Sequence, residues 1–326
     1  MSIDTSSAAV FNADPEYTRQ YETGVKSSWL DDRLSTTLSA YQIERFNIRY
    51  RPDAQNDPYT WAVGGKHRSR GVELSAIGQI IPKKCFPELN DSQRTALLKR
   101  HFQHMAKLIL EYGLYWYAPA DKLRSLVRYQ DKHHLDEALA AGEKVIILYP
   151  HFTAFEMAVY TLNQDVPLTS MYSHQKNKAL DEQILKGRHR YNNVFLIGRT
   201  EGLRAIIKHL RKSDAPFLYL PDQDFGRNDS IFVNFFGIQT ATITGLSRIA
   251  GMTKAKIIPA IPTREADNTV TLRFYPAWDN FPTENVEADT QRMNDFIEER
   301  VREHPEQYFW LHKRFKTRPE GESSFY

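Results

Sequence analysis

The spacing of hydrophobic and polar residues changes near residue 83. Before that point, apolar residues alternate with polar ones in two runs, Leu34–Ala40 and Val72–Ala76. Alternation with a period of two is typical of β-strands. Turn-forming residues punctuate these runs at positions 31–32, 51–58 and 64–65. The first 83 residues are therefore predicted to form a polar-rich antiparallel meander.

After residue 83 the pattern becomes helical and then alternates between strands and helices. The first helix carries Leu98, Phe102, Met105, Ile109 and Tyr112 at 3.6-residue spacing, with Asn90, Asp91 and Ser92 as N-cap candidates. Strands are predicted at 144–149, 166–172, 194–197, 216–220, 256–261 and 269–275, separated by helices near 154–163, 177–190, 201–212, 241–252 and 286–303. This alternation predicts an α/β fold with a mixed, largely parallel central sheet flanked by helices.

Composition narrows the class of protein. The chain has 326 residues, of which 41% are hydrophobic and 25% charged, as in a soluble globular protein. A net charge of +3 is too small to indicate a nucleic-acid partner. Cys85 is the only cysteine, which excludes an intrachain disulfide and a multi-cysteine zinc site. No apolar run reaches 18 residues, and the N-terminus has no secretory signal pattern.

A candidate site follows the most apolar short run, VIILY, which ends at Tyr149. The next residues include His151 and Glu156, and sites in parallel α/β sheets gather beyond the carboxyl ends of strands. His151 could act as a general base whose tautomer is fixed by Glu156. Alternatively, Thr153 and Glu156 form a capping box, T-x-x-E, which starts a helix. Local spacing does not decide between these interpretations.

Two further groups of charged residues lie after predicted strands. The basic cluster Lys186–Arg190, which includes Arg188 and Arg190, suits a phosphate or carboxylate partner, although a solvated helix face is the alternative. Asp222 and Asp224 follow the strand FLYL; tight-turn chemistry explains Asp224, and we expect Asp222 to be functional. Arg188, Arg190 and Asp222 are therefore candidate substrate-binding residues.

The C-terminal segment Tyr308–Pro319 interleaves aromatic rings with cations. It could dock on anionic lipid headgroups, or it could pack on the core as a C-terminal strand. Neither interpretation is favoured by the pattern alone.

Several motifs are absent from the sequence. There is no G-x-S-x-G elbow, Walker loop, G-x-G-x-x-G or H-E-x-x-H. His101 and His104 have no companion ligands, so we expect surface histidines and no metal site. Direct attack by a substrate hydroxyl, activated by His151, is the remaining route for catalysis.

From residue 84 to the C-terminus, five motifs occur in an order that resembles the late acyltransferases of lipid A biosynthesis. They are KCFPEL (84–89), H-x4-E (151–156), GRHR (187–190), LPDQDFGRNDSIFVNFFG (220–237) and YFWLHKRFKTRPEG (308–321). The set is most similar to the myristoyl/lauroyl branch of Gram-negative bacteria. H-x4-E alone is also found in glycerolipid acyltransferases, whose fold the resemblance implies.

The resemblance implies transfer of an acyl group from acyl carrier protein to a hydroxyl of a lipid A precursor. His151 would be the general base, Glu156 its orienting partner and Arg188 part of the substrate site. No cofactor is implied beyond the acyl-acyl carrier protein co-substrate. The expected location is the cytoplasmic face of the inner membrane, with peripheral attachment because the family's apolar N-terminal anchor is not found before KCFPEL.

Residues 15–83 resemble strands of a TonB-dependent siderophore receptor barrel, in ETGVKSSWLDDRLSTTLSAYQIERFNIRYRPD and VGGKHRSRGVELSAIGQIIP. The chain is therefore predicted to join a receptor fragment, residues 1–83, to an acyltransferase domain, residues 84–326. A few barrel strands cannot close, so we expect the first part to be poorly packed and without receptor function. An acyl thioesterase, an inactive fusion product and a membrane-surface binding protein are the alternative functions.

Overall fold

The structure is a computed structural model that describes residues 15–29, 34–50, 55, 62–64, 66–78, 81–191, 194–198, 201–228 and 230–326. The chain divides into two compact units, residues 1–80 and 81–326. The division lies close to the predicted domain boundary at residue 83.

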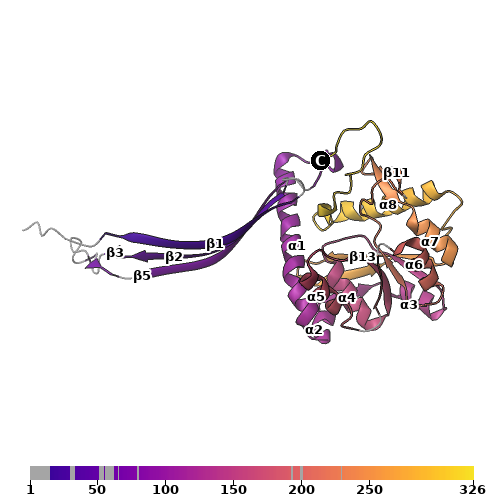
Figure 1. Cartoon of the computed structure of the whole chain (residues 1–326), viewed down its shortest axis with the longest axis horizontal. Helices are drawn as coiled ribbons and strands as arrows, with labels where there is room; N and C mark the ends of the chain where they lie inside the picture. Colours follow the sequence, from indigo (N-terminus) through magenta and orange to yellow (C-terminus); the bar gives the residue numbers. More distant parts are fainter. Residues whose placement is uncertain are drawn as a thin grey trace, which may run out of the picture. The chain divides into compact units, whose positions relative to one another are not determined.

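The first unit is built on three antiparallel strands of 13 residues each, in the order β1-β2-β5. They are β1 (Tyr17–Trp29), β2 (Leu34–Phe46) and β5 (Lys66–Gly78), and they lie side by side in Figure 1. Two-residue strands β3 (Arg49–Tyr50) and β4 (Ala62–Val63) pair with each other. The predicted antiparallel strands are thus confirmed, whereas most of the predicted turns at 31–32 and 51–58 lie outside the described residues.

Apolar side chains of this unit remain exposed to solvent. Tyr21, Val25, Leu38 and Val72 are each more than half exposed. A sheet whose apolar residues stay in water gains little from the hydrophobic effect. That the unit is poorly packed and has no receptor function stays a prediction.

The second unit is organised around a seven-stranded sheet with the order β6-β14-β13-β7-β10-β8-β9. Its strands are β6 (Val127–Gln130), β7 (Val145–Leu148), β8 (Leu168–Tyr172), β9 (Val194–Gly198), β10 (Phe217–Tyr219), β13 (Lys256–Arg264) and β14 (Val270–Phe274). Neighbouring strands are parallel except β13 and β14, which are antiparallel. The predicted mixed, largely parallel sheet is confirmed.

Eight helices accompany this sheet in the described part of the chain (Figure 1). They are α1 (Asp91–Tyr117), α2 (Ala120–Arg124), α3 (His133–Ala140), α4 (Phe155–Asp165), α5 (Lys178–Arg188), α6 (Gly202–Leu210), α7 (Gly245–Thr253) and α8 (Val286–Glu303). Short 3-10 helices, η1 (Lys83–Cys85) and η3 (Trp310–His312), and a hairpin of β11 (Ser230–Phe235) with β12 (Ile238–Ile243) complete the unit. The helix predicted at 241–252 begins only at Gly245, because Ile238–Ile243 pairs with β11.

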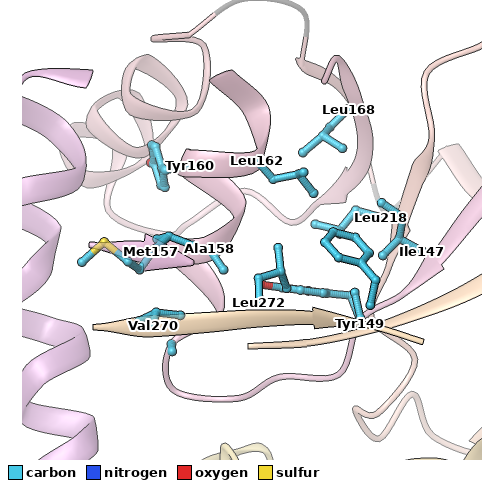
Figure 2. Close-up of a cluster of buried hydrophobic side chains, with 14 of the residues drawn as sticks. Ile147, Tyr149, Met157, Ala158, Tyr160, Leu162, Leu168, Leu218, Val270 and Leu272 are labelled. Carbon is cyan, nitrogen blue, oxygen red and sulfur yellow. The ribbon is translucent and has the colours of Figure 1, made fainter. Parts of the chain in front are cut away.

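The core lies between α4 and the centre of the sheet. All four residues of β7 are buried, so both faces of this strand are covered. Figure 2 shows Met157, Ala158 and Leu162 of α4 above Leu272 of β14, with Ile147 of β7 to their right. Burial of these apolar side chains fixes the start of α4 against the end of β7, which is where the candidate site lies.

Helix α1 begins at the predicted position but buries a different face. Asn90 is its N-cap and forms a capping box with Gln93. The buried residues are Leu97, His101, Met105, Leu108 and Tyr115, whereas Ile109, which belongs to the apolar spacing that predicted the helix, is exposed. The prediction that His101 is a surface residue is wrong, because its side chain is fully buried.

Candidate functional site

Two neighbouring parallel strands bring His151 and Asp222 together. Strands β7 and β10 pair in a register that sets Leu148 opposite Tyr219. His151 and Asp222 each follow three residues after these paired positions. Because the strands run in the same direction, their carboxyl ends lie at one edge of the sheet, and the two turns that follow meet there.

The Asp222 carboxylate holds His151 through two hydrogen bonds. One oxygen accepts from the backbone N–H of His151 at 2.8 Å, and the other lies 2.7 Å from the ring atom Nδ1. Both residues are buried. Two contacts from one carboxylate fix the position of the residue and the rotation of its ring.

The charge state of Asp222 determines the tautomer of His151. Burial opposes ionisation of Asp222, but His151 and, more weakly, His312 favour it, and the net effect lowers its pKa to about 2. An ionised carboxylate only accepts hydrogen bonds, so the Nδ1 atom of His151 carries the proton. The Nε2 atom then carries the lone pair of the ring, as a general base requires.

No hydrogen bond joins the Glu156 carboxylate to the His151 ring in the described structure. One carboxylate oxygen of Glu156 accepts a hydrogen bond from Arg188 at 2.9 Å and lies 3.4 Å from the hydroxyl of Tyr112. The carboxylate bonded to the imidazole is that of Asp222, which was predicted as a substrate-binding residue. The four residues between His151 and Glu156 turn the chain into α4, so proximity in sequence does not bring the Glu156 carboxylate to the ring.

The capping-box interpretation of Thr153 and Glu156 is wrong. The N-cap of α4 is Ala154, and no side chain caps this helix. The hydroxyl of Thr153 is buried without a hydrogen-bond partner in the described structure. Glu156 therefore accepts hydrogen bonds from Arg188 and Tyr112 and does not cap the helix.

The predicted substrate-binding arginines occupy two different environments. Arg188, at the end of α5, pairs with Glu156 and lies over the ring of Tyr172, 5.0 Å from its centroid. Arg190 instead donates to the backbone carbonyls of Tyr115 and Ala118 at the carboxyl end of α1. Arg188 thus contacts the first turn of α4 through Glu156, whereas Arg190 binds backbone carbonyls at the carboxyl end of α1.

Two residues that the sequence did not single out complete the site. The side-chain nitrogen of Gln223 lies 3.2 Å from Nε2 of His151 and 3.2 Å from Nε2 of His312. The two imidazole rings are 4.6 Å apart between centroids. Burial, followed by the nearby His151, lowers the pKa of His312 to about 3, so His312 is neutral. Gln223 and His312 each lie within one of the five motifs given above, and Gln223 immediately follows Asp222. These positions were the signal in the sequence that could have identified the two residues.

The C-terminal aromatic segment packs into the unit. Tyr308, Trp310, Phe315 and Arg314 are buried, and Tyr308 bridges to Phe152. The lipid-docking interpretation is wrong for these side chains, and core packing holds, although the segment forms a 3-10 helix rather than a regular strand.

The turn after β10 is tied to this C-terminal segment. Asp224 accepts hydrogen bonds from the backbone of Gly226 and from the backbone and hydroxyl of Thr317. The turn role expected for Asp224 agrees with these contacts. These contacts join the turn that carries Gln223 to the C-terminal segment that carries His312.

Neither a membrane-spanning helix nor a metal-binding cluster is found in the described ranges. No described helix combines the length and the apolar character needed to cross a bilayer. Likewise, no three His, Cys, Asp or Glu side chains among the described residues are grouped to hold a metal ion.

Comparison with known families gives matches over both units. The model of the bacterial lipid A biosynthesis acyltransferases matches residues 82–317. The model of the TonB dependent receptor-like β-barrel matches residues 3–142, a range that includes the three long antiparallel strands.

Three curated relatives come from Escherichia coli (strain K12). The lipid A biosynthesis palmitoleoyltransferase is 31% identical over 247 residues, covering 74% of this chain and 78% of the relative. The lauroyltransferase is 30% identical, covering 74% and 79%, and the myristoyltransferase is 29% identical, covering 84% and 85%. Because relatives named for three acyl groups are about equally similar, the comparison does not select an acyl length.

Proposed function

The chain belongs to the family of bacterial lipid A biosynthesis acyltransferases, and on that premise we propose that it transfers a fatty acyl group from acyl carrier protein to a hydroxyl of a lipid A precursor. That it is an acyltransferase follows from the family. The thioester donor and the roles of individual residues are the proposed part.

The observation that carries the mechanism is the buried pair of His151 and Asp222. Asp222 holds Nδ1–H at 2.7 Å and leaves the Nε2 lone pair for the acceptor hydroxyl. As the hydroxyl oxygen attacks the thioester carbon, its proton passes to Nε2, and Asp222 stabilises the imidazolium that forms. Collapse of the tetrahedral intermediate breaks the C–S bond, and the leaving thiolate takes the proton from Nε2.

Arg188 is proposed to bind an anionic group of a substrate. Its guanidinium has five N–H donors in a planar fork, and the bond to Glu156 uses part of this capacity. Glu156 then fixes the direction of Arg188, and Tyr112 supports Glu156 from α1. In this proposal the H-x4-E glutamate contributes to the site through Arg188 and not through His151.

A peripheral position at the cytoplasmic face of the inner membrane fits a lipid acceptor. Ile109, Leu110 and Tyr117 of α1 are each more than 60% exposed and supply apolar surface for contact with lipid. Flotation of the protein with liposomes that contain anionic lipid would test this; a protein that stayed at the bottom of the gradient at low salt would contradict it.

The reaction can be tested with the purified chain, an acyl carrier protein thioester and a lipid A precursor. We expect a lipid product heavier by one acyl group, detected by mass spectrometry, together with free carrier thiol in equal amount. Release of free fatty acid at a rate independent of the lipid acceptor would instead indicate a thioesterase. Lipid binding without either product would contradict the proposed activity.

A further inference from the structure

The carboxamide of Gln223 is held between two imidazoles. Its nitrogen lies 3.2 Å from Nε2 of His151 and 3.2 Å from Nε2 of His312. Because Asp222 fixes the proton of His151 on Nδ1, Nε2 of His151 can only accept a hydrogen bond. An amide NH₂ has two N–H donors, so one can serve each ring.

This arrangement differs from that of a glutamine that braces the backbone. Gln307 is buried, and its carboxamide exchanges two hydrogen bonds with the backbone of Arg264. Gln223 is only partly buried, and both contacts of its nitrogen in the described structure are to imidazole rings of the site. Its donors are therefore aimed at the place where the reacting atoms must assemble.

During acyl transfer the resting contact between Gln223 and His151 cannot persist. The acceptor hydroxyl must donate its proton to the same Nε2 lone pair that Gln223 occupies. His312 keeps the second N–H bond, so the carboxamide is retained beside Nε2 when the first bond is released. The carbonyl oxygen of the thioester is then two bonds from the hydroxyl oxygen bound at Nε2, within the region that the freed N–H can reach.

We propose that Gln223, anchored by His312, is a catalytic residue whose N–H moves from the His151 imidazole to the developing oxyanion of the acyl group. The inference rests on the proposed function. The hydroxyl proton goes to His151 as the O–C bond forms and the carbonyl π pair moves onto oxygen, where Gln223 donates its hydrogen bond. When the C=O bond re-forms and the C–S bond breaks, the thiolate takes the proton from Nε2 and Gln223 returns to His151.

The direct test replaces Gln223 by methionine, which is similar in length and has no N–H donor. Single-turnover acyl transfer is measured at increasing enzyme concentration, with Gln164→Met as the control; Gln164 is a partly buried glutamine that donates to the Ala120 carbonyl. Loss of one oxyanion donor predicts a maximal rate lower by about 10²–10³-fold. The half-saturating concentration should change little, since the donor acts on the transition state.

The variant His312→Phe tests whether His312 anchors Gln223. It still tests the inference if Gln223→Met does not fold. It keeps an aromatic ring against Phe309, whose centroid lies 4.5 Å from that of His312, and removes the acceptor nitrogen. We expect a smaller loss of maximal rate than in Gln223→Met and no further loss in the double variant, because the two residues act as one unit.

The outcomes separate this inference from the proposed function. If the wild-type chain transfers no acyl group, the proposed function fails. The wild type can transfer the acyl group while Gln223→Met keeps the wild-type maximal rate or changes only the half-saturating enzyme concentration. In that case Gln223 is not an oxyanion donor. Additive losses in the double variant would contradict the anchoring role of His312.

Discussion

Asp222 keeps its negative charge at a fully buried position because it is bonded at both oxygens. The backbone N–H and the ring of His151 supply these contacts, and together they outweigh the cost of desolvation. A buried carboxylate with a lowered pKa is a source of stability that depends on pH. In the proposed mechanism the same two bonds also serve catalysis.

The pH dependence of this contribution can be worked out from the pKa of Asp222. Its depression from the usual 3.8 to about 2 corresponds to roughly 2 kcal/mol. The contribution of Asp222 to stability is complete above the pKa of its carboxyl group in the unfolded chain. It is lost as the pH falls from about 4 towards 2. We expect the free energy of unfolding of the wild type to approach that of Asp222→Asn over this range. Urea titrations at successive pH values would show it, and a constant difference would refute it.

At the residue scale, the sequence indicated His151 but not its partner. The position of His151 after VIILY was sufficient to predict a site at the carboxyl end of a strand. The link to Asp222 requires that β7 and β10 are neighbours, although β8 and β9 lie between them in sequence. Glu156 was chosen as partner because it is close in sequence, whereas the contact is made across the sheet.

At the element scale, helix α1 shows how a buried titratable group couples to pH. His101 lies on its buried face, and its Nδ1 is 3.0 Å from the backbone carbonyl of Glu306. Burial lowers the pKa of His101 to about 4 and outweighs that contact, which favours the charged form. The folded chain therefore keeps this ring neutral at a pH where the unfolded chain protonates it.

This predicts a loss of stability in mild acid. Below its ordinary value of 6.5, His101 binds a proton only in the unfolded state, so stability falls as the pH drops from about 6.5 to 4. The full effect is roughly 3 kcal/mol. In His101→Asn the fall in unfolding free energy between pH 6.5 and pH 4 should be smaller by that amount, so its slope against pH is shallower, while His133→Asn, at an exposed position of α3, keeps the wild-type slope. An unchanged slope in His101→Asn would show that His101 is not the group responsible.

Most strands of the central sheet and the long helices were predictable from the sequence, whereas β6 and β12 were not. Helix α8 was predicted with its observed bounds, Val286–Glu303, and six sheet strands were found within a few residues. Strand β6 was missed because four residues with two polar members carry little periodic signal, and its partner β14 is distant in sequence. Strand β12 was partly assigned to a helix, although its Thr240 and Thr242 are β-branched and favour a strand.

At the scale of the whole molecule, the two units differ in how much apolar surface they bury. The second has a continuous core around β7 and α4, whereas the first leaves large apolar side chains in solvent. Since the hydrophobic effect is the main source of stability, the first unit should open more readily.

Limited proteolysis of the full chain would compare the two units directly. Trypsin should cleave first within residues 1–80, where Arg19, Lys26 and Arg70 are exposed, and leave a fragment close to residues 81–326. Peptide mass analysis over time gives the order of cleavage. A resistant N-terminal fragment, with earlier cleavage in the second unit, would contradict the predicted poor packing.

The central claim is that His151 is the general base of an acyl transfer. It is tested most directly by comparing the wild type and His151→Ala with the same carrier-protein thioester and lipid A precursor. We predict transfer by the wild type and a rate about 10²–10⁴-fold lower in His151→Ala, with an unchanged fold by circular dichroism. Acylation by His151→Ala at the wild-type rate would contradict the account.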